Sequence, residues 1–367
     1  MIEESGITRR QFVAMAFVAA LSPLIRRFPR VLAEDAGRTA WLAVIFTALP
    51  MALSLLLAHL LFRRRPEDAG LADVFCAALG RGGGRVLAAL YALWMLAYTA
   101  FSLRAGAERF ISTVYFGAKP WPFIAVMALL AGLAALGGLK PLARSAMIFR
   151  PLLAAVFVLL FALAAKELDL RLLLPVTAAD LPGDLWAAAQ LSNNLSAVFY
   201  LAFFGREVRG RFRVRDYVGW CGAMLLIVGL MTVGCLGLFG PALTAEFSFP
   251  FFMLVRDVTI LGSLERAEPV VIAIWVFSDF TLCALLLRAA VRSLRFAFAP
   301  QREETRRLRR ALTALCTLAA AAAAFFMARS AAAFDLLSET LIPWGTGIFT
   351  GGAMLLLIAI LALRRRL

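Results

Sequence analysis

The feature that most limits the fold of this chain is a series of apolar blocks, each about twenty residues long, separated by short connections rich in arginine. Twenty helical residues rise about 30 Å, which matches the hydrocarbon core of a bilayer. Hydrophobic residues make up 62% of the 367 residues and charged residues 17%, against about 45–50% and about 25% in soluble domains. We therefore expect an all-α, polytopic integral membrane protein.

Ten blocks are long enough to be transmembrane helices, and together they predict one transmembrane domain over residues 1–367. Their ranges are 11–33, 40–62, 85–108, 120–137, 145–165, 185–205, 217–239, 267–287, 308–328 and 343–363. The longest outer connection contains Ser248 and Pro250, which suit a helix N-terminus, and Gly262, which suits its end. An outer lid helix is therefore expected at about 248–262.

Arginine and lysine are distributed unevenly between the two sides of this arrangement. If the N-terminus is cytoplasmic, 26 of the 38 basic residues fall on the inner side, including the five arginines from Arg206 to Arg215. The positive-inside rule then places both termini in the cytoplasm. The net charge of +15 is explained by contact with anionic lipid headgroups, so no nucleic-acid partner is expected.

No pattern in the chain indicates catalysis. The five cysteines are scattered without C-x-x-C spacing, and His59 is the only histidine. The sequence contains no P-loop, no G-x-S-x-G and no H-E-x-x-H. We therefore expect no enzyme activity, no metal and no cofactor.

Two blocks carry polar or helix-breaking residues near the middle of the membrane. Ser22 and Pro23 interrupt the first block, and the sixth contains Ser192, Asn193, Asn194 and Ser196. Discontinuous helices at matching places in two halves are typical of inverted-repeat transporters. The expected halves are 11–165 and 185–363, with helices 1 and 6 broken. The alternative is a proline kink and a polar seam between helices.

Several short motifs resemble one family over essentially the whole chain. They are Ile7-Thr8-x-x-Gln11, Ala36-Gly37-x-x-Ala40-Trp41, Leu79-Gly80, Phe249-Pro250 through Arg256, Leu264-Glu265-Arg266-x-Glu268, and Trp275. The chain resembles the endospore germination permeases, the GerAB-type B subunits of nutrient germinant receptors, in the amino acid–polyamine–organocation superfamily. The resemblance implies a LeuT-like 5+5 inverted repeat and a ligand site at the broken helices. It also implies A-type and C-type receptor partners in the spore inner membrane.

The third block carries an aromatic stripe and a charged pair. Tyr91, Trp94, Tyr98 and Ser102 share one helical face. Such a stripe is either packing or the wall of a ligand site, and the second interpretation makes Tyr98 and Ser102 ligand-binding candidates. Arg104 and Glu108, four residues apart, predict an ion pair that is either structural or a gate.

Arg26 and Arg27 follow the expected break in the first block. They either meet an anionic ligand group or extend to the outer headgroups. Arg26 is therefore a candidate for a gate or an ion pair.

Asp279 is the strongest single candidate for a functional residue. It lies about midway between Glu268 and Arg288, which bracket the eighth block, so it is expected near the bilayer midplane. Intramembrane acids are costly and usually functional. With the hydroxyl of Ser278 nearby, Asp279 could hold a ligand amine, a cation or a proton. The alternative is a buried acid bonded to a neighbouring helix, for instance to an arginine.

These observations predict a subunit that binds a small nutrient, an amino acid, and signals to its partner subunits by conformational change. The alternative is a stand-alone secondary transporter for amino acids or related solutes, because sensor and transporter share a fold.

Overall fold

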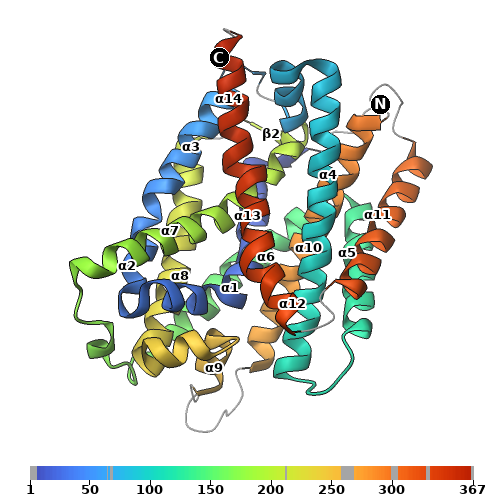
Figure 1. Cartoon of the computed structure of the whole chain (residues 1–367). Helices are drawn as coiled ribbons and strands as arrows, with labels where there is room; N and C mark the ends of the chain where they lie inside the picture. Colours follow the sequence, from blue (N-terminus) through green and yellow to red (C-terminus); the bar gives the residue numbers. More distant parts are fainter. Residues whose placement is uncertain are drawn as a thin grey trace.

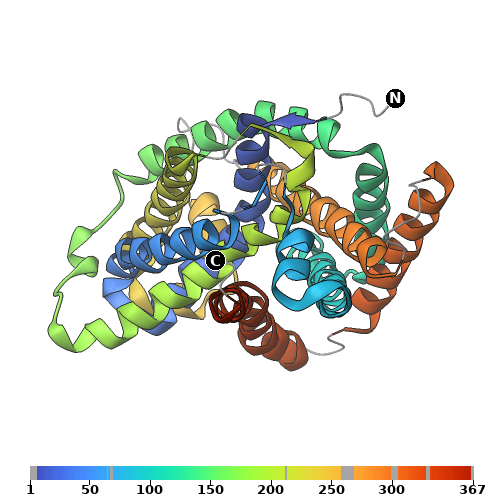
Figure 2. The ribbon, with the colours of Figure 1, turned by 90° about the horizontal axis from the view of Figure 1, so that it is seen from above.

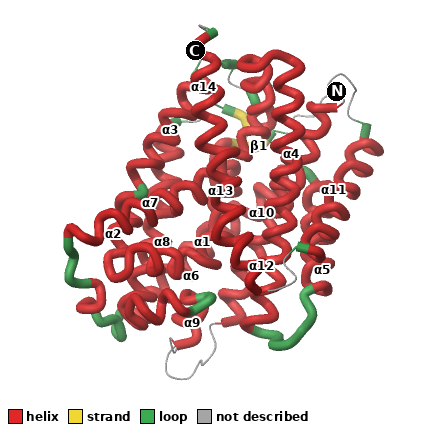
Figure 3. The backbone as a smooth tube through the Cα atoms, viewed as in Figure 1, coloured by secondary structure: helices red, strands yellow, loops and turns green. Residues whose placement is uncertain are grey.

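A computed structural model describes residues 6–63, 65–66, 69–210, 213–257, 268–298, 305–327 and 331–364, and it is almost entirely helical (Figures 1 and 3). The first half contains α1 (Arg9–Ala36), α2 (Ala40–Phe46), α3 (Ala48–Phe62), α4 (Leu71–Thr113), α5 (Trp121–Gly137) and α6 (Leu139–Ala164). The second half contains α7 (Leu181–Ser196), α8 (Val214–Glu246), α9 (Pro250–Asp257), α10 (Glu268–Phe298), α11 (Arg306–Phe326), α12 (Ala331–Leu336), α13 (Ile342–Gly347) and α14 (Ala353–Leu363).

Shorter elements connect these helices. A 3₁₀ segment, η4 (Ala197–Glu207), continues α7, and π-helical turns at Leu337–Leu341 and Ile348–Gly352 join α12, α13 and α14 into one run. The 3₁₀ turns η1 (Gly37–Thr39), η2 (Leu170–Leu173) and η3 (Ala178–Asp180) complete the connections.

Among the described residues, seven helical runs are long and apolar enough to cross a membrane. They are Arg9–Phe62, Leu71–Thr113, Leu139–Ala164, Val214–Glu246, Ile272–Phe298, Arg306–Phe326 and Ala333–Leu363, and the shorter apolar helix Trp121–Gly137 accompanies them. The first run contains the first two predicted blocks, and the sixth block forms α7 and η4. The integral, multi-pass character is confirmed, whereas the count of ten crossings stays a prediction.

Helix α1 forms the centre of the molecule, packing against α6, α7, α8 and α10, while α4 packs along α10. Seen from above, α5 and α11 lie at one edge of the bundle and the start of α7 lies at the opposite edge (Figure 2). The two ends of the chain lie at the same end of the bundle (Figure 1). Which side of a membrane this end faces stays a prediction.

The first sequence motif has a structural role at the start of α1. Thr8 and Gln11 form a capping box, in which the Gln11 N–H donates to Thr8 Oγ1 at 3.3 Å and the Thr8 N–H to Gln11 Oε1 at 2.8 Å. The preceding strand β1 (Ile7–Thr8) pairs in parallel with β2 (Val208–Arg209). The start of the chain is thus fastened to the end of η4.

The structure corrects the predicted interruption of helix 1. Helix α1 stays α-helical through Ser22 and Pro23. A proline removes one backbone donor, and packed neighbouring helices let a membrane helix accommodate that loss. Helix α7 likewise continues through Asn194 to Ser196, and then the hydrogen bonding changes to 3₁₀. The sixth predicted block therefore changes helix type directly after its polar residues instead of opening.

The structure describes the first part of the predicted lid segment as helix α9. Helix α9 covers Pro250–Asp257, and Phe251 and Phe252 are buried on its inner face. The predicted remainder, 258–262, lies outside the described residues. The division of the chain into repeats at 11–165 and 185–363 stays a prediction.

Candidate functional site

A cavity of about 470 Å³, including the open space at its mouth, lies where α1, α4 and α7 meet the α12–α14 run. Its lining combines apolar side chains with amides, hydroxyls and two arginines: Pro23, Arg26, Arg27, Phe28, Val31, Phe101, Gln190, Asn193, Asn194, Ser338, Ile342, Pro343 and Thr346. No Asp or Glu belongs to this described lining. Six of the thirteen lining residues are apolar and seven carry polar groups, so the lining offers both apolar contact and hydrogen bonds to a small molecule.

Arg26 is the unusual member of the lining. It projects from α1 one turn after Pro23, and only 7% of its surface is exposed. Its guanidinium lies 4.9 Å from the centroid of the Phe101 ring. Nε and Nη1 are buried and have no hydrogen-bond partner among the described residues. A buried cation without partners is costly, so this group is available to something that enters the cavity.

Arg27, its neighbour, is already paired. Its Nη1 donates to Ser338 Oγ at 2.7 Å, and its Nη2 lies 3.1 Å from Glu339 Oε1. These contacts tie α1 to the turn between α12 and α13. Of the two arginines that the sequence singled out, the structure thus leaves only Arg26 with free donors in the cavity.

The polar residues of α7 point in different directions. Asn193 and Asn194 line the cavity. Asn193 donates through Nδ2 to the Pro343 carbonyl at 2.6 Å, whereas Asn194 Oδ1 is buried without a partner. Ser192 points away toward Met51, with its hydroxyl 3.6 Å from the thioether sulfur, and Ser196 bonds to neighbouring groups. The structure therefore brings Pro23, Asn193 and Asn194 together with Arg26.

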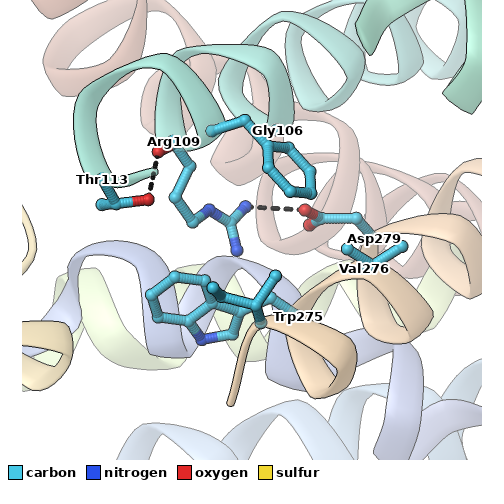
Figure 4. A pocket seen from close by; sticks show the side chains of 8 residues that line it. Gly106, Arg109, Thr113, Trp275, Val276 and Asp279 are labelled. Carbon is cyan, nitrogen blue, oxygen red and sulfur yellow. Dashed lines mark hydrogen bonds and ion pairs between the residues drawn. The ribbon is translucent and has the colours of Figure 1, made fainter. Parts of the chain in front are cut away.

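Ser22 and Asp279 belong to a separate cluster. Asp279 is buried, with 3% of its surface exposed. It accepts hydrogen bonds from Ser22 Oγ and from Arg109 Nη2, the second at 2.7 Å. The Arg109 guanidinium in turn lies against the Trp275 ring (Figure 4), 5.0 Å from the ring centroid. This cluster connects α1, α4 and α10.

The cluster lines a second cavity, of about 210 Å³ with its open space. Its lining residues are Gly106, Arg109, Phe110, Thr113, Ile272, Trp275, Val276 and Asp279 (Figure 4). Of the two interpretations of Asp279, the structure matches the buried acid bonded to an arginine of a neighbouring helix. The buried Ser278 hydroxyl beside it has no partner among the described residues. Ligand roles for these two residues stay predictions.

Arg109 was missed in the sequence. Its position seven residues after Ser102 places it on the face of the aromatic stripe, which could have marked it as inward-pointing. The ion pair predicted between Arg104 and Glu108 does form, with both side chains partly buried on α4. A gating role for that pair stays a prediction.

The aromatic stripe is engaged in packing. Tyr91 donates its hydroxyl proton to the Phe349 carbonyl, and Trp94 donates through Nε1 to the Tyr200 hydroxyl at 2.8 Å. Tyr98 stacks on Trp94, with the ring centroids 6.3 Å apart. Neither Tyr98 nor the buried Ser102 lines the larger cavity. Their assignment to a ligand site stays a prediction.

Charged side chains also meet near η4, at the end of the bundle where the chain begins and ends. Glu207 accepts hydrogen bonds from Arg288, at 3.0 Å, and from Arg292. Arg206 forms an ion pair with Asp73, in which Arg206 Nη2 lies 2.7 Å from Asp73 Oδ1. In the part of the chain that the structure describes, no three His, Cys, Asp or Glu side chains are grouped to hold a metal ion.

Comparison with known proteins gives two kinds of match. A model of the family described as spore germination protein matches residues 6–332. The protein named "Putative spore germination protein YfkT" of Bacillus subtilis (strain 168) is 25% identical over 257 residues, covering 69% of each chain.

Solved structures of transporters share the fold. MhsT in complex with L-phenylalanine has a TM-score of 0.62 at 18% identity, covering 99% of this chain and 96% of MhsT. Mhp1 is a nucleobase-cation-symport-1 family transporter, here in a closed conformation with bromovinylhydantoin bound. Its TM-score is 0.68 at 14% identity, and the match covers 99% of this chain and 80% of Mhp1. A Na⁺-coupled sialic acid symporter has a TM-score of 0.62 at 14% identity, and the match covers 93% of this chain and 77% of the symporter. The predicted LeuT-like fold is confirmed.

Proposed function

Because the chain belongs to the spore germination protein family, we propose that it is the nutrient-binding subunit of a germinant receptor. The nutrient, an amino acid, binds in the cavity between α1, α4, α7 and the α12–α14 run. One observation carries this proposal: Arg26 and Asn194 both line the cavity, and each has buried polar atoms without a hydrogen-bond partner among the described residues. Buried polar groups in native proteins are normally satisfied, so a ligand would complete them.

Binding would act by shifting a conformational equilibrium. The lining comes from helices far apart in the chain, so a ligand that contacts α1, α7 and α13 together favours the arrangement in which these helices are close. A-type and C-type subunits of the spore inner membrane would respond to that arrangement. This supports a receptor without any chemical step.

A stand-alone secondary transporter is the second candidate. It is favoured by the fold shared with MhsT and Mhp1, although similarity at this level of identity carries the fold alone. Uptake of labelled amino acids into proteoliposomes that contain only this chain supports the transporter. Binding without uptake supports the receptor.

The test of the site uses the two faces of α7. Asn194→Leu removes the unpartnered amide from the cavity, so the nutrient response of spores should be lost while the abundance of the protein stays normal. Ser192→Ala alters the same helix on the face toward Met51 and should leave the response intact. Equal responses in wild type and Asn194→Leu would place the ligand elsewhere.

A further inference from the structure

The two arginines that line the larger cavity differ in their pairing. Arg27 is matched by Glu339 at 3.1 Å, and Arg109 is matched by Asp279 at 2.7 Å. Arg26 has no ion pair or hydrogen bond to any residue in the described ranges, although 93% of its surface is covered. Of the two charged side chains in the described lining, Arg26 is therefore the one without a direct ion-pair partner.

Such a charge is expensive inside a membrane protein. Burying an arginine at membrane depth costs free energy, and intramembrane charges are normally paired or face a wet cavity. The Phe101 ring covers one face of the guanidinium at 4.9 Å, which leaves the N–H groups at its edge for a partner. The edge of a guanidinium fits a carboxylate by two parallel hydrogen bonds.

We propose that the ligand of this cavity is a small organic acid bound through its carboxylate to Arg26. The inference rests on the proposed function and names the ligand group that is recognised. A carboxylate would supply the ion-pair partner that Arg26 lacks among the described residues. A ligand that carried only an ammonium group would add a second positive charge to the cavity. Asn194 Oδ1 accepts a hydrogen bond from an amino or hydroxyl group on the same ligand.

Asp279 is not among the residues that line this cavity, so an amine of a ligand bound there would not be held by its carboxylate. Both oxygens of that carboxylate are engaged, one by Ser22 and one by Arg109. It lines the smaller cavity and not the larger one. An amino acid would thus be held by its acid end, and its amino group would meet neutral oxygens.

The experiment uses the full chain in lipid nanodiscs and measures the thermal unfolding midpoint. The probes are the standard L-amino acids and the primary amide of each, all at millimolar concentration. Binding to the folded state raises the midpoint. At least one acid should raise it, and the matching amide, which lacks the carboxylate, should not.

Variants then assign the effect to one side chain. Arg26→Gln should weaken binding of that acid about thirtyfold or more, as expected when one partner of a buried charged pair is removed. Arg26→Lys keeps the charge and should retain part of the affinity. Arg30→Gln is the matched control, because Arg30 lies one turn further along α1, pairs with Glu34 at 2.6 Å and does not line the cavity.

Three outcomes would count against the inference. An amide that stabilises the protein as well as its acid would show that the carboxylate is not recognised. An unchanged affinity in Arg26→Gln would show that Arg26 does not bind it. Either result overturns the inference and leaves nutrient binding standing, whereas a panel in which no acid and no amide raises the midpoint overturns both. If Arg26→Gln fails to fold, the acid–amide comparison in the wild type and in Arg26→Lys still decides.

Discussion

The buried pair of Arg109 and Asp279 is expected to stabilise the contact between α4 and α10. Their side chains are 3% and 4% exposed, and the distance is 2.7 Å. Replacing Asp279 by Asn keeps the shape and removes the charge, which leaves the Arg109 cation buried. Nε and Nη1 of Arg109 have no hydrogen-bond partner among the described residues, so Asn at 279 would weaken the one hydrogen bond that this guanidinium makes there. Breaking such a pair costs about 3–5 kcal/mol.

A double-mutant cycle separates the pair from the individual residues. Asp279→Asn and Arg109→Met should each lower the free energy of unfolding by about that amount, because each strands the other charge. The double variant should cost much less than the sum, with a coupling of about 2 kcal/mol or more. Ser278→Ala is the control, since the hydroxyl of Ser278 has no partner, and removing it should change stability by less than about 1 kcal/mol.

The assay is reversible unfolding of the full chain in mixed micelles by added SDS, followed by circular dichroism. A cost below about 1 kcal/mol for Asp279→Asn, or strictly additive single and double variants, would refute the reasoning. The first result would mean that water or another group replaces the arginine. The second would mean that the two side chains do not depend on each other.

Three further predictions follow from separate contacts. A Cβ at Gly345 would overlap the ring of Trp94. Gly345→Ala should therefore lower the free energy of unfolding by about 1–3 kcal/mol, measured by the same SDS titration. A neutral result would contradict the close approach of α13 to α4. Glu207→Gln weakens the part-exposed ion pair with Arg288 and should lower the free energy of unfolding by about 1 kcal/mol or less. Backbone hydrogen exchange in η4 should become faster. Unchanged exchange would mean that the ion pair does not restrain η4. Cysteines placed in the loop 206–215 should react with a membrane-impermeant reagent only from the cytoplasmic side, and labelling from outside would reverse the proposed orientation.

The helices could be predicted from the sequence because their signal is local. Twenty-residue apolar blocks follow directly from the thickness of the bilayer, and the Thr8–Gln11 motif is a capping box that contains its own partners. The burial of Asp279 could also be expected from its place in the middle of an apolar block. Its partner could not be deduced, because the approach of α4 to α10 depends on the packing of the whole bundle.

Other features depended on tertiary contacts in the same way. Pro23 reads as a break, yet the packed neighbours keep α1 helical across it. Arg26 and Arg27 look equivalent in the sequence, and only the position of Glu339 makes one paired and the other free. The direction of each polar residue of α7 likewise depends on which helix lies opposite. A sequence shows which polar groups are buried more readily than whether they are satisfied.

The 3₁₀ segment η4 has a geometric consequence for signalling. It spans eleven residues, Ala197–Glu207, and begins three residues after Asn194. A 3₁₀ helix rises about 2.0 Å per residue and an α-helix about 1.5 Å, so rewinding this segment would shorten it by about 5 Å. This shortening would move Glu207 and the adjoining β2 toward the cavity. The distance between spin labels at the two ends of η4 would measure it. A change of helix type in η4 would thus change the distance between the ligand cavity and the end of the molecule where the chain begins and ends.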